Sequence, residues 1–202
     1  MASIEYITLE VNDPSAVGGF YADAFGLDKL VHLRASDVPT SGFRGFTLSL
    51  VVSQPATANG FIDAAIEAGG TVVKPVEKSL WGYGGVVQGP DGTIVTVASS
   101  SKKDTGPAAR EFDELVLQLG VADVAASRRF YVDRGFDVAK SYGRRYVQFD
   151  SGPVTLVLYK RRGLAKVAGV SPDGSGSHRI VVGSDAGPFT DPDGFEWEAT
   201  SA

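Results

Sequence analysis

The chain of 202 residues contains no cysteine, a single methionine and only two histidines. The absence of cysteine excludes disulfides, thiolate nucleophiles and metal sites with thiolate ligands. Two histidines are also too few for a centre built mainly from imidazole groups. Acidic residues outnumber basic ones by 24 to 19, which gives a net charge of −5, so we expect no broad basic surface for nucleic acid.

Long apolar runs are missing as well. No apolar stretch approaches the roughly 20 residues that a membrane-spanning helix needs. The opening sequence MASIEYITLEV has no basic segment ahead of an apolar one, so no secretory signal is predicted. We therefore expect a cytoplasmic globular protein, a monomer or homodimer, without nucleic-acid or membrane partners.

The most informative feature that is present is an internal repeat. The phrase GPDGTIVTV at 89–97 returns as DPDGFEWEA at 191–199. Upstream, VNDPSAVGGFYADAFGLD at 11–28 matches VADVAASRRFYVDRGFDV at 121–138. Two landmarks in the same order indicate a duplicated unit of about a hundred residues.

The repeat sets the expected domain organisation. The polar stretch SSSKKDTGPAAR, rich in Ser, Lys, Gly and Pro, is typical of a linker. We predict a first half at 1–99, a linker at 100–111 and a second half at 112–202.

Each half begins with a strand followed by a helix. Apolar and polar residues alternate in IEYITLEV (4–11) and in ELVLQLGV (114–121), as in strands with one buried face. Asp13, with Pro14 after it, and Asp123 are predicted N-caps of the helices that follow. Several further strands complete each half, so the pattern predicts an α+β fold with helices on one face of curved mixed sheets.

The repeated phrase has a physical interpretation of its own. Proline at the second position presets φ, and glycine at the fourth tolerates the exit conformation, so both copies predict a type I turn between two strands.

These motifs resemble those of the vicinal oxygen chelate superfamily, which includes glyoxalases, bleomycin resistance proteins, extradiol dioxygenases and fosfomycin-inactivating enzymes. The resemblance implies tandem βαβββ modules wrapped into cups. The sequence predicts truncations, with no strands between 36 and 44 and no helix between 184 and 190. The late motif is Asp191–Glu198, and the early motif consists of Val121, Asp123, Ser127, Phe130, Tyr131, Asp133 and Gly135.

The resemblance also implies where a divalent metal would be held. The family uses a His or Gln seven residues before the Asp that begins a helix, and a Glu four residues after PDG. In the first half these positions are Tyr6, Thr47 and Thr96, which suggests a metal-free cup. In the second half they are Val116, His178 and Glu198, and Glu114 on the same strand face as Val116 is a substitute third ligand. Zn, Ni, Mn or Fe would suit such ligands.

Simpler interpretations of the same residues remain open. His178 stands at a strand start, where a histidine is commonly solvated or hydrogen-bonded. Glu198 lies near the C-terminal end of the sequence, and Glu114 is typical of a surface residue.

Aromatic residues are the second signal for a site. Trp81 and Tyr83 stand among glycines in WGYGGVV, a setting that is hard to explain as core. Small-molecule pockets are mostly apolar with a few polar anchors. The predicted ligand-binding residues are Trp81, Tyr83, Phe46, Tyr6 and Trp197, with core packing as the alternative for most of them.

Two function classes follow. The favoured one is metal-independent binding of a small, aromatic molecule. The alternative is a metal-dependent lyase, isomerase or dioxygenase of the glyoxalase type, in which His178 and Glu198 hold the ion and Glu114 serves as ligand or general base.

Overall fold

The computed structural model of the chain describes residues 1–200. The first half contains β1 (Ile4–Val11), α1 (Pro14–Gly19), the π-helical turn η1 (Phe20–Ala24), β2 (Val31–Ala35), β3 (Thr40–Gly42), β4 (Phe46–Val51), α2 (Pro55–Glu67), β5 (Thr71–Lys78), β6 (Tyr83–Gln88) and β7 (Ile94–Ser99). The second half contains β8 (Glu114–Val121), α3 (Val124–Val132), β9 (Asp137–Tyr142), β10 (Tyr146–Asp150), β11 (Val154–Lys160), α4 (Arg161–Ala168), β12 (Gly174–Gly176), β13 (Ile180–Ser184), β14 (Phe189–Thr190) and β15 (Glu196–Ala199).

The first helix of each half begins at its predicted cap. The Asp13 carboxylate accepts hydrogen bonds from the backbone N–H groups of Ser15 and Ala16, at 2.9 and 3.3 Å. Asp123 does the same in the second half, at 2.9 and 3.1 Å to the next two helical residues. Because a cap satisfies N–H groups that have no partner within the helix, it fixes the residue at which the helix begins.

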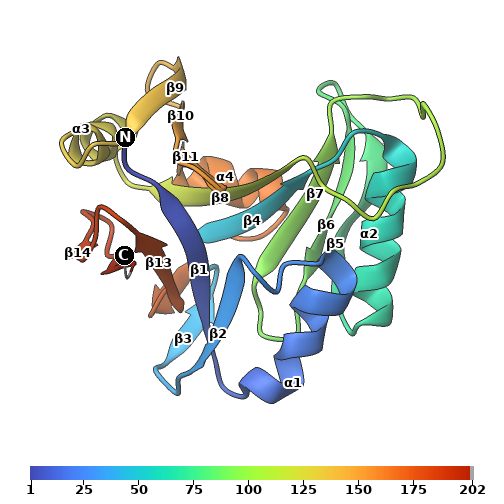
Figure 1. Cartoon of the computed structure of the whole chain (residues 1–202), viewed down its shortest axis with the longest axis horizontal. Coiled ribbons are helices and arrows are strands. Elements are labelled where there is room, and N and C mark those ends of the chain that lie inside the picture. Colours follow the sequence, from blue (N-terminus) through green and yellow to red (C-terminus); the bar gives the residue numbers. More distant parts are fainter. Residues whose placement is uncertain (201–202) are drawn as a thin grey trace.

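Two large sheets carry the fold, and each contains strands from both halves (Figure 1). The eight-stranded sheet has the order β5-β6-β7-β4-β8-β11-β10-β9, and the five-stranded sheet has the order β14-β15-β13-β1-β2. The seams between the halves are antiparallel: β4 pairs with β8, and β1 pairs with β13. The repeats are therefore interleaved, since each sheet is completed by the opposite half.

A third, two-stranded sheet corrects one expectation. The prediction of no strand between 36 and 44 is wrong, because β3 pairs there with β12 of the second half. The backbones approach closely: a Cβ on Gly174 would lie 2.2 Å from the Phe43 carbonyl oxygen, so only glycine fits. Between 184 and 190 the chain forms no helix, as expected, and enters the short strand β14.

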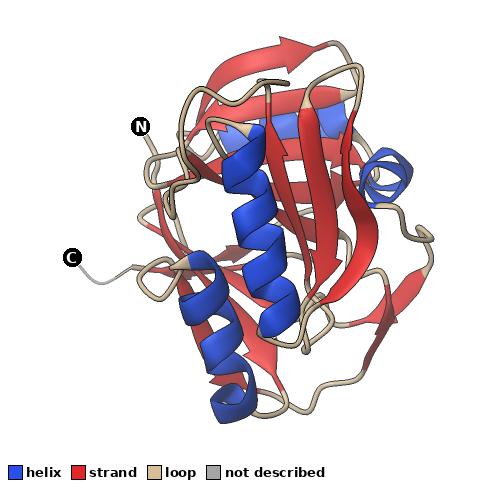
Figure 2. Cartoon of the chain, turned by 90° about the vertical axis from the view of Figure 1, so that its right-hand side faces the viewer, coloured by secondary structure: helices blue, strands red, loops and turns tan. Residues whose placement is uncertain are grey.

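Helices cover the outer face of the eight-stranded sheet, the face that carries Val87, Val95 and Val97. Helix α2 lies across β5, β6 and β7, as Figure 2 shows, and α3 packs against β10 and β11. Buried side chains of α2, including Phe61 and Ile62, share one apolar core with these valines. Because alternate strand residues point to opposite faces, the other residues of the same strands form an inner face.

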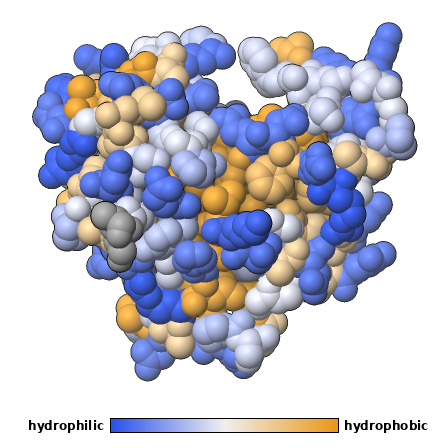
Figure 3. Space-filling view, in the orientation of Figure 1, coloured by the Kyte–Doolittle hydropathy of each residue, from blue (hydrophilic) through white to orange (hydrophobic). Residues whose placement is uncertain are grey.

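The surface of the molecule shows both kinds of residue. In the view of Figure 3, hydrophilic residues cover the left and right sides of the molecule, and apolar residues gather in the middle. Within residues 1–200, no helix combines the length and the apolar character that a membrane crossing requires.

Both copies of the repeated turn form as predicted. The Gly92 N–H donates to the Gly89 carbonyl at 2.9 Å, and the Gly194 N–H donates to the Asp191 carbonyl at 3.1 Å. Gly92 and Gly194 both have φ of 88°, a left-handed conformation that other residues rarely adopt. The turns thus explain why glycine stands fourth in each copy.

Candidate functional site

The inner face of the eight-stranded sheet carries a row of small polar side chains at its centre. Thr96 on β7 lies beside Ser49 on β4, and Ser49 lies opposite Val116 on β8. One step along the sheet, Thr47 faces Gln118, and the Thr47 hydroxyl donates to Gln118 Oε1 at 2.8 Å. Neighbouring strands are about 4.8 Å apart, so these groups form one compact floor.

The family resemblance places one set of metal-ligand positions in each half of the sequence. The pairing of the strands brings these positions together in different sets. Thr47 and Thr96 of the first half meet Val116 of the second half on the eight-stranded sheet. Tyr6 of the first half meets Glu198 of the second half on the five-stranded sheet, where the Tyr6 hydroxyl donates to Glu198 at 3.2 Å. Each set therefore mixes residues of both halves, because the sheets are interleaved.

Helix α4 lies across the inner face and divides it. The helix begins where the chain crosses β8: a Cβ on Gly120 would lie 3.0 Å from the Arg161 Cα, so glycine permits the close approach. At its other end, Ala168 is buried against Val86 and Ile94 of the sheet. A cavity remains on each side of this apolar contact.

The larger cavity has a volume of about 390 Å³. Its floor is formed by Ser49, Thr96 and Gln118, and the hairpin of β5 and β6 supplies the rim. The predicted ligand-binding residues Trp81 and Tyr83 both line this rim. The Trp81 side chain is 85% exposed, an unusual state for a large apolar group.

Two charged residues of β5 also line the larger cavity, Lys74 and Glu77. The Lys74 ammonium donates to the carbonyls of Lys166 and Val167 near the end of α4, at 3.2 and 2.8 Å. Lys74 therefore ties α4 to the sheet and complements the negative end of the helix.

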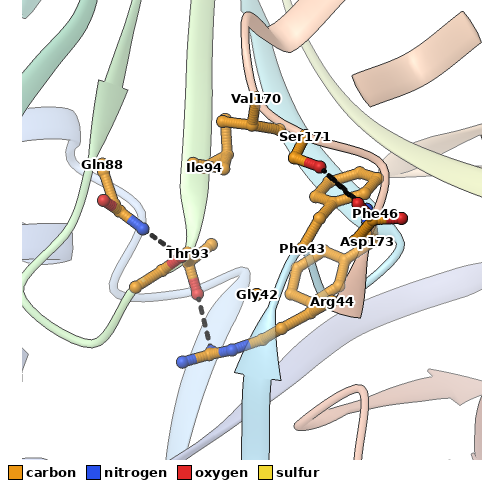
Figure 4. Close-up of a pocket in the computed structure, with 11 residues that line it drawn as sticks. Gly42, Phe43, Arg44, Phe46, Gln88, Thr93, Ile94, Val170, Ser171 and Asp173 are labelled. Carbon is orange, nitrogen blue, oxygen red and sulfur yellow. Dashed lines mark hydrogen bonds between the residues drawn. The ribbon is translucent and has the colours of Figure 1, made fainter. Parts of the chain in front are cut away.

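The smaller cavity, of about 300 Å³, lies beyond the contact of Ala168 with the sheet. Figure 4 shows the aromatic rings of Phe43 and Phe46 on one side and Gln88, Thr93 and Ile94 on the other. Phe46, a predicted ligand-binding residue, thus lines this cavity and not the larger one, and it is almost fully buried.

Arg44, which lines the smaller cavity, belongs to a buried ion pair. Arg44 Nη1 lies 3.7 Å from Asp91 Oδ2, and the two side chains are only 11% and 2% exposed. Burial lowers the pKa of Arg44, and the neighbouring Asp91 carboxylate opposes that shift. Arg44 also donates to the Asp91 carbonyl and, at 3.5 Å, to the Thr93 hydroxyl. These bonds fix the arginine to the first repeated turn.

The other two predicted ligand-binding residues lie away from both cavities. Trp197 is buried in an aromatic cluster, with its ring centroid 5.3 Å from that of Tyr131 and 5.0 Å from that of Phe189. Tyr6 stacks on His32 with centroids 4.5 Å apart. Partial burial, followed by the effect of the nearby Glu198 carboxylate, raises the pKa of Tyr6.

The three predicted metal ligands do not come together. His178 stacks on Phe195 at 4.0 Å, and its two ring nitrogens contact the backbone carbonyls of Arg44 and Asp193. Glu198 pairs with Gly183 inside β13, whereas His178 lies before the start of that strand at Ile180. His178 thus joins the second repeated turn to the loop before β4.

The two carboxylates are also engaged elsewhere. Glu198 accepts from Arg34 Nη2 at 2.8 and 3.1 Å in addition to the bond from Tyr6. Glu114, on the eight-stranded sheet, accepts a hydrogen bond from the Thr155 hydroxyl. Burial, then the charges of neighbouring groups that include Glu114, raises the pKa of Tyr146 to about 12.

The donor chemistry of these positions does not fit a divalent metal ion. The floor of the larger cavity offers neutral hydroxyl and amide groups, whereas Zn, Ni, Mn and Fe favour imidazole and carboxylate ligands. On the five-stranded sheet the guanidinium of Arg34 already balances the charge of Glu198. No group of three or more His, Asp or Glu side chains within residues 1–200 is arranged to hold a metal.

Ser49 and Gln118 were not predicted from the sequence as site residues. Both stand on strands whose neighbours are strongly apolar, in FTLSLV and ELVLQLGV. Alternating polar residues in such strands usually face solvent. The signal that could have found them is the central position of β4 and β8 in the sheet. That position depends on how the two halves pair, which the sequence does not show directly.

The eight-stranded sheet consists of paired βαβββ modules, and comparison with solved structures finds the same fold elsewhere. Glyoxalase I from Zea mays superposes with a TM-score of 0.62 and 13% identity, over 98% of this chain and 92% of that one. A putative dioxygenase from Bacillus subtilis superposes with a TM-score of 0.55 and 14% identity, over 90% of this chain and 69% of that one.

The chain therefore has the fold of the vicinal oxygen chelate superfamily, as the motifs implied. At the sequence level, neither a protein-family model nor a curated protein matches it.

Proposed function

We propose that this protein binds a small planar organic molecule, without a metal ion, in the larger cavity on the inner face of the eight-stranded sheet. The observation that carries the proposal is the composition of that cavity. A floor of neutral hydrogen-bonding groups, Ser49, Thr96 and Gln118, lies below a rim that includes Trp81 and Tyr83. Mostly apolar walls with a few placed polar groups are typical of small-molecule sites.

The size of the cavity supports a ligand of two fused rings. A volume of about 390 Å³ lies at the lower end of the range for ligand sites, which begins at about 300 Å³. Trp81 is free to close over such a ligand, because it is exposed and stands at the tip of a hairpin. Burial of its ring against a flat ligand would contribute stacking energy beyond the area buried.

Equilibrium dialysis of metal-stripped protein against naphthalene derivatives and coumarin tests this function. We expect one-to-one binding in the micromolar range that is unchanged by EDTA. Trp81→Ala should weaken it by about tenfold, because loss of a stacking aromatic costs roughly 0.5–1.5 kcal/mol beyond its buried area. Leu80→Ala is the matched control, since Leu80 is exposed on the same hairpin but does not line the cavity.

A parallel titration with Mn²⁺, Fe²⁺, Ni²⁺ and Zn²⁺ separates the proposal from the metal-dependent alternative. For that alternative Glu198 would have to leave Arg34 and Tyr6. Stoichiometric metal binding that is lost in Glu198→Ala would overturn metal independence. Absence of binding to every aromatic compound tested would overturn the binding function itself.

A further inference from the structure

The floor of the larger cavity presents hydrogen-bond donors with no protein acceptor. The Thr47 hydroxyl is fully buried and donates to Gln118 Oε1, which turns the Gln118 amide so that its N–H groups point away from Thr47. Within residues 1–200, the only buried side-chain nitrogen or oxygen without a partner is Trp197 Nε1. The Gln118 Nε2 group therefore reaches the open space of the cavity that Gln118 lines.

Ser49 adds a second donor beside it. Ser49 is only 6% exposed and lines the cavity, its hydroxyl bonds to no group of residues 1–200, and its strand neighbours are Thr96 and Val116. The Thr96 hydroxyl differs, because it lies 3.5 Å from the Leu48 carbonyl, to which it donates. Gln118 and Ser49 are thus the two groups that a ligand oxygen would meet first.

The same floor disfavours a negatively charged ligand group. Its polar groups are uncharged, and a carboxylate would lose its hydration there without a paired cation. Lys74 directs its ammonium to the carbonyls of α4, and Glu77 adds a negative charge to the lining. An uncharged acceptor is the chemical group that suits these surroundings.

We propose that the larger cavity selects planar aromatic molecules bearing an uncharged carbonyl oxygen, as in an aryl ketone or a quinone, which accepts hydrogen bonds from Gln118 Nε2 and the Ser49 hydroxyl. This inference rests on the proposed function and names the ligand class of the same site. Thr47 is a positioning residue in it, because it acts only through the orientation of the Gln118 amide.

Three matched probes test the inference by equilibrium dialysis: 2-acetylnaphthalene, 2-ethylnaphthalene and 2-naphthoate. The first two differ by a single carbonyl oxygen, and the third carries a charged group instead. We expect the ketone to bind about 3- to 10-fold more tightly than the ethyl compound, the usual effect of a net hydrogen bond. We expect the naphthoate to bind most weakly.

Gln118→Met keeps the length of the side chain and removes the donor. In this variant the ketone should bind no better than 2-ethylnaphthalene, whose own affinity should change by less than about twofold. Thr47→Val should reduce the preference for the ketone partly, by releasing the amide. Gln148→Met is the matched control, because Gln148 lies on β10, outside the cavity lining.

The outcomes separate the two proposals. If both neutral probes bind wild-type protein equally, or if Gln118→Met keeps the preference for the ketone, the inference is overturned and the binding function stands. If no aromatic compound binds at all, the binding function fails and the inference fails with it. Should Gln118→Met not fold, Ser49→Ala provides the same comparison with an expected two- to threefold loss of preference.

Discussion

Each of the two repeated turns is anchored by the tyrosine at the same position of its repeat. The aspartate that accepts the hydrogen bond, however, stands at a different position of the turn in each copy. In the second half the Tyr131 hydroxyl donates to Asp191, the first residue of the turn, at 2.6 Å. In the first half the Tyr21 hydroxyl donates to Asp91, the third residue of the turn, at 2.7 Å. The position equivalent to Asp191 is Gly89, where a Cβ would lie 2.8 Å from the Asp91 carboxylate. Two different tyrosine–aspartate hydrogen bonds therefore stabilise the same turn geometry.

The difference between the anchors is electrostatic. Asp91 also receives a hydrogen bond from Thr93 at 2.6 Å and faces the cation of Arg44. Asp191 has no such cation beside it within residues 1–200, and it is held by Tyr131 and two backbone N–H groups, at 2.9 and 2.8 Å. Burial raises the pKa of Asp191, and these hydrogen bonds oppose that shift. A duplicated turn can thus diverge in charge while its backbone stays the same.

The largest expected effect comes from removing the cation that distinguishes the first turn. Arg44→Met leaves the Asp91 charge buried without its cation, which typically costs about 3–5 kcal/mol in the free energy of unfolding. Urea unfolding at neutral pH measures this cost. The double variant with Asp91→Asn should recover most of it, because the uncompensated charge is gone.

Arg34→Met is the matched control for that measurement. Its partner is Glu198, and the two side chains are 47% and 29% exposed, so the loss should stay within about 1 kcal/mol. Equal losses in Arg44→Met and Arg34→Met would show that burial of the ion pair makes no difference.

A smaller effect compares the two tyrosine hydroxyls. Tyr131→Phe should cost about 1.5–3 kcal/mol, the range for a hydrogen bond to a charged group. Tyr21→Phe should cost less, about 0.5–1.5 kcal/mol, because Asp91 keeps both Thr93 and Arg44. Denaturant unfolding of both variants gives the difference, and a larger loss for Tyr21→Phe would contradict the electrostatic explanation.

The smallest effect is a dependence on pH. The pKa of Asp191 is raised in the folded state, so the folded protein binds this proton more readily than the unfolded chain does. Wild-type stability relative to Asp191→Asn should therefore rise as pH falls through the raised pKa, and level off below the unfolded value of 3.8. Each unit of pKa difference corresponds to about 1.4 kcal/mol.

Unfolding curves of both proteins between pH 7 and pH 4 test this dependence. A wild-type protein that loses stability relative to Asp191→Asn on acidification would place the folded pKa below 3.8, and would remove the contrast between the two turns.

The elements of the fold could be predicted from the sequence because their signals are local. Asp13 and Asp123 cap helices, and the glycines of the two turns require positive φ, whatever the rest of the chain does. The pairing of β4 with β8 and of β1 with β13 could not be predicted in this way. Alternation identifies which face of a strand is buried, but not which strand lies beside it.

The site was only partly predictable for the same reason. Trp81 and Tyr83 were proposed because aromatics among glycines are locally unusual, and both line the larger cavity. Ser49 and Gln118 are ordinary strand residues that become a floor only when β4 and β8 meet at the seam. His178 was proposed as a ligand from its spacing, and the structure instead places its ring between two backbone carbonyls.

The interleaved pairing of strands has a consequence for how this protein can be divided. A chain opened within residues 100–111 would yield two fragments, one with unpaired strand edges at β1 and β4 and the other with unpaired edges at β8 and β13. Neither fragment would contain the whole floor of the larger cavity, because Ser49 and Thr96 lie on one fragment and Gln118 lies on the other. The segment that connects the repeats keeps two complementary pieces at a high effective concentration, and it also hydrogen-bonds to Gln54 and Ala56 at the start of α2.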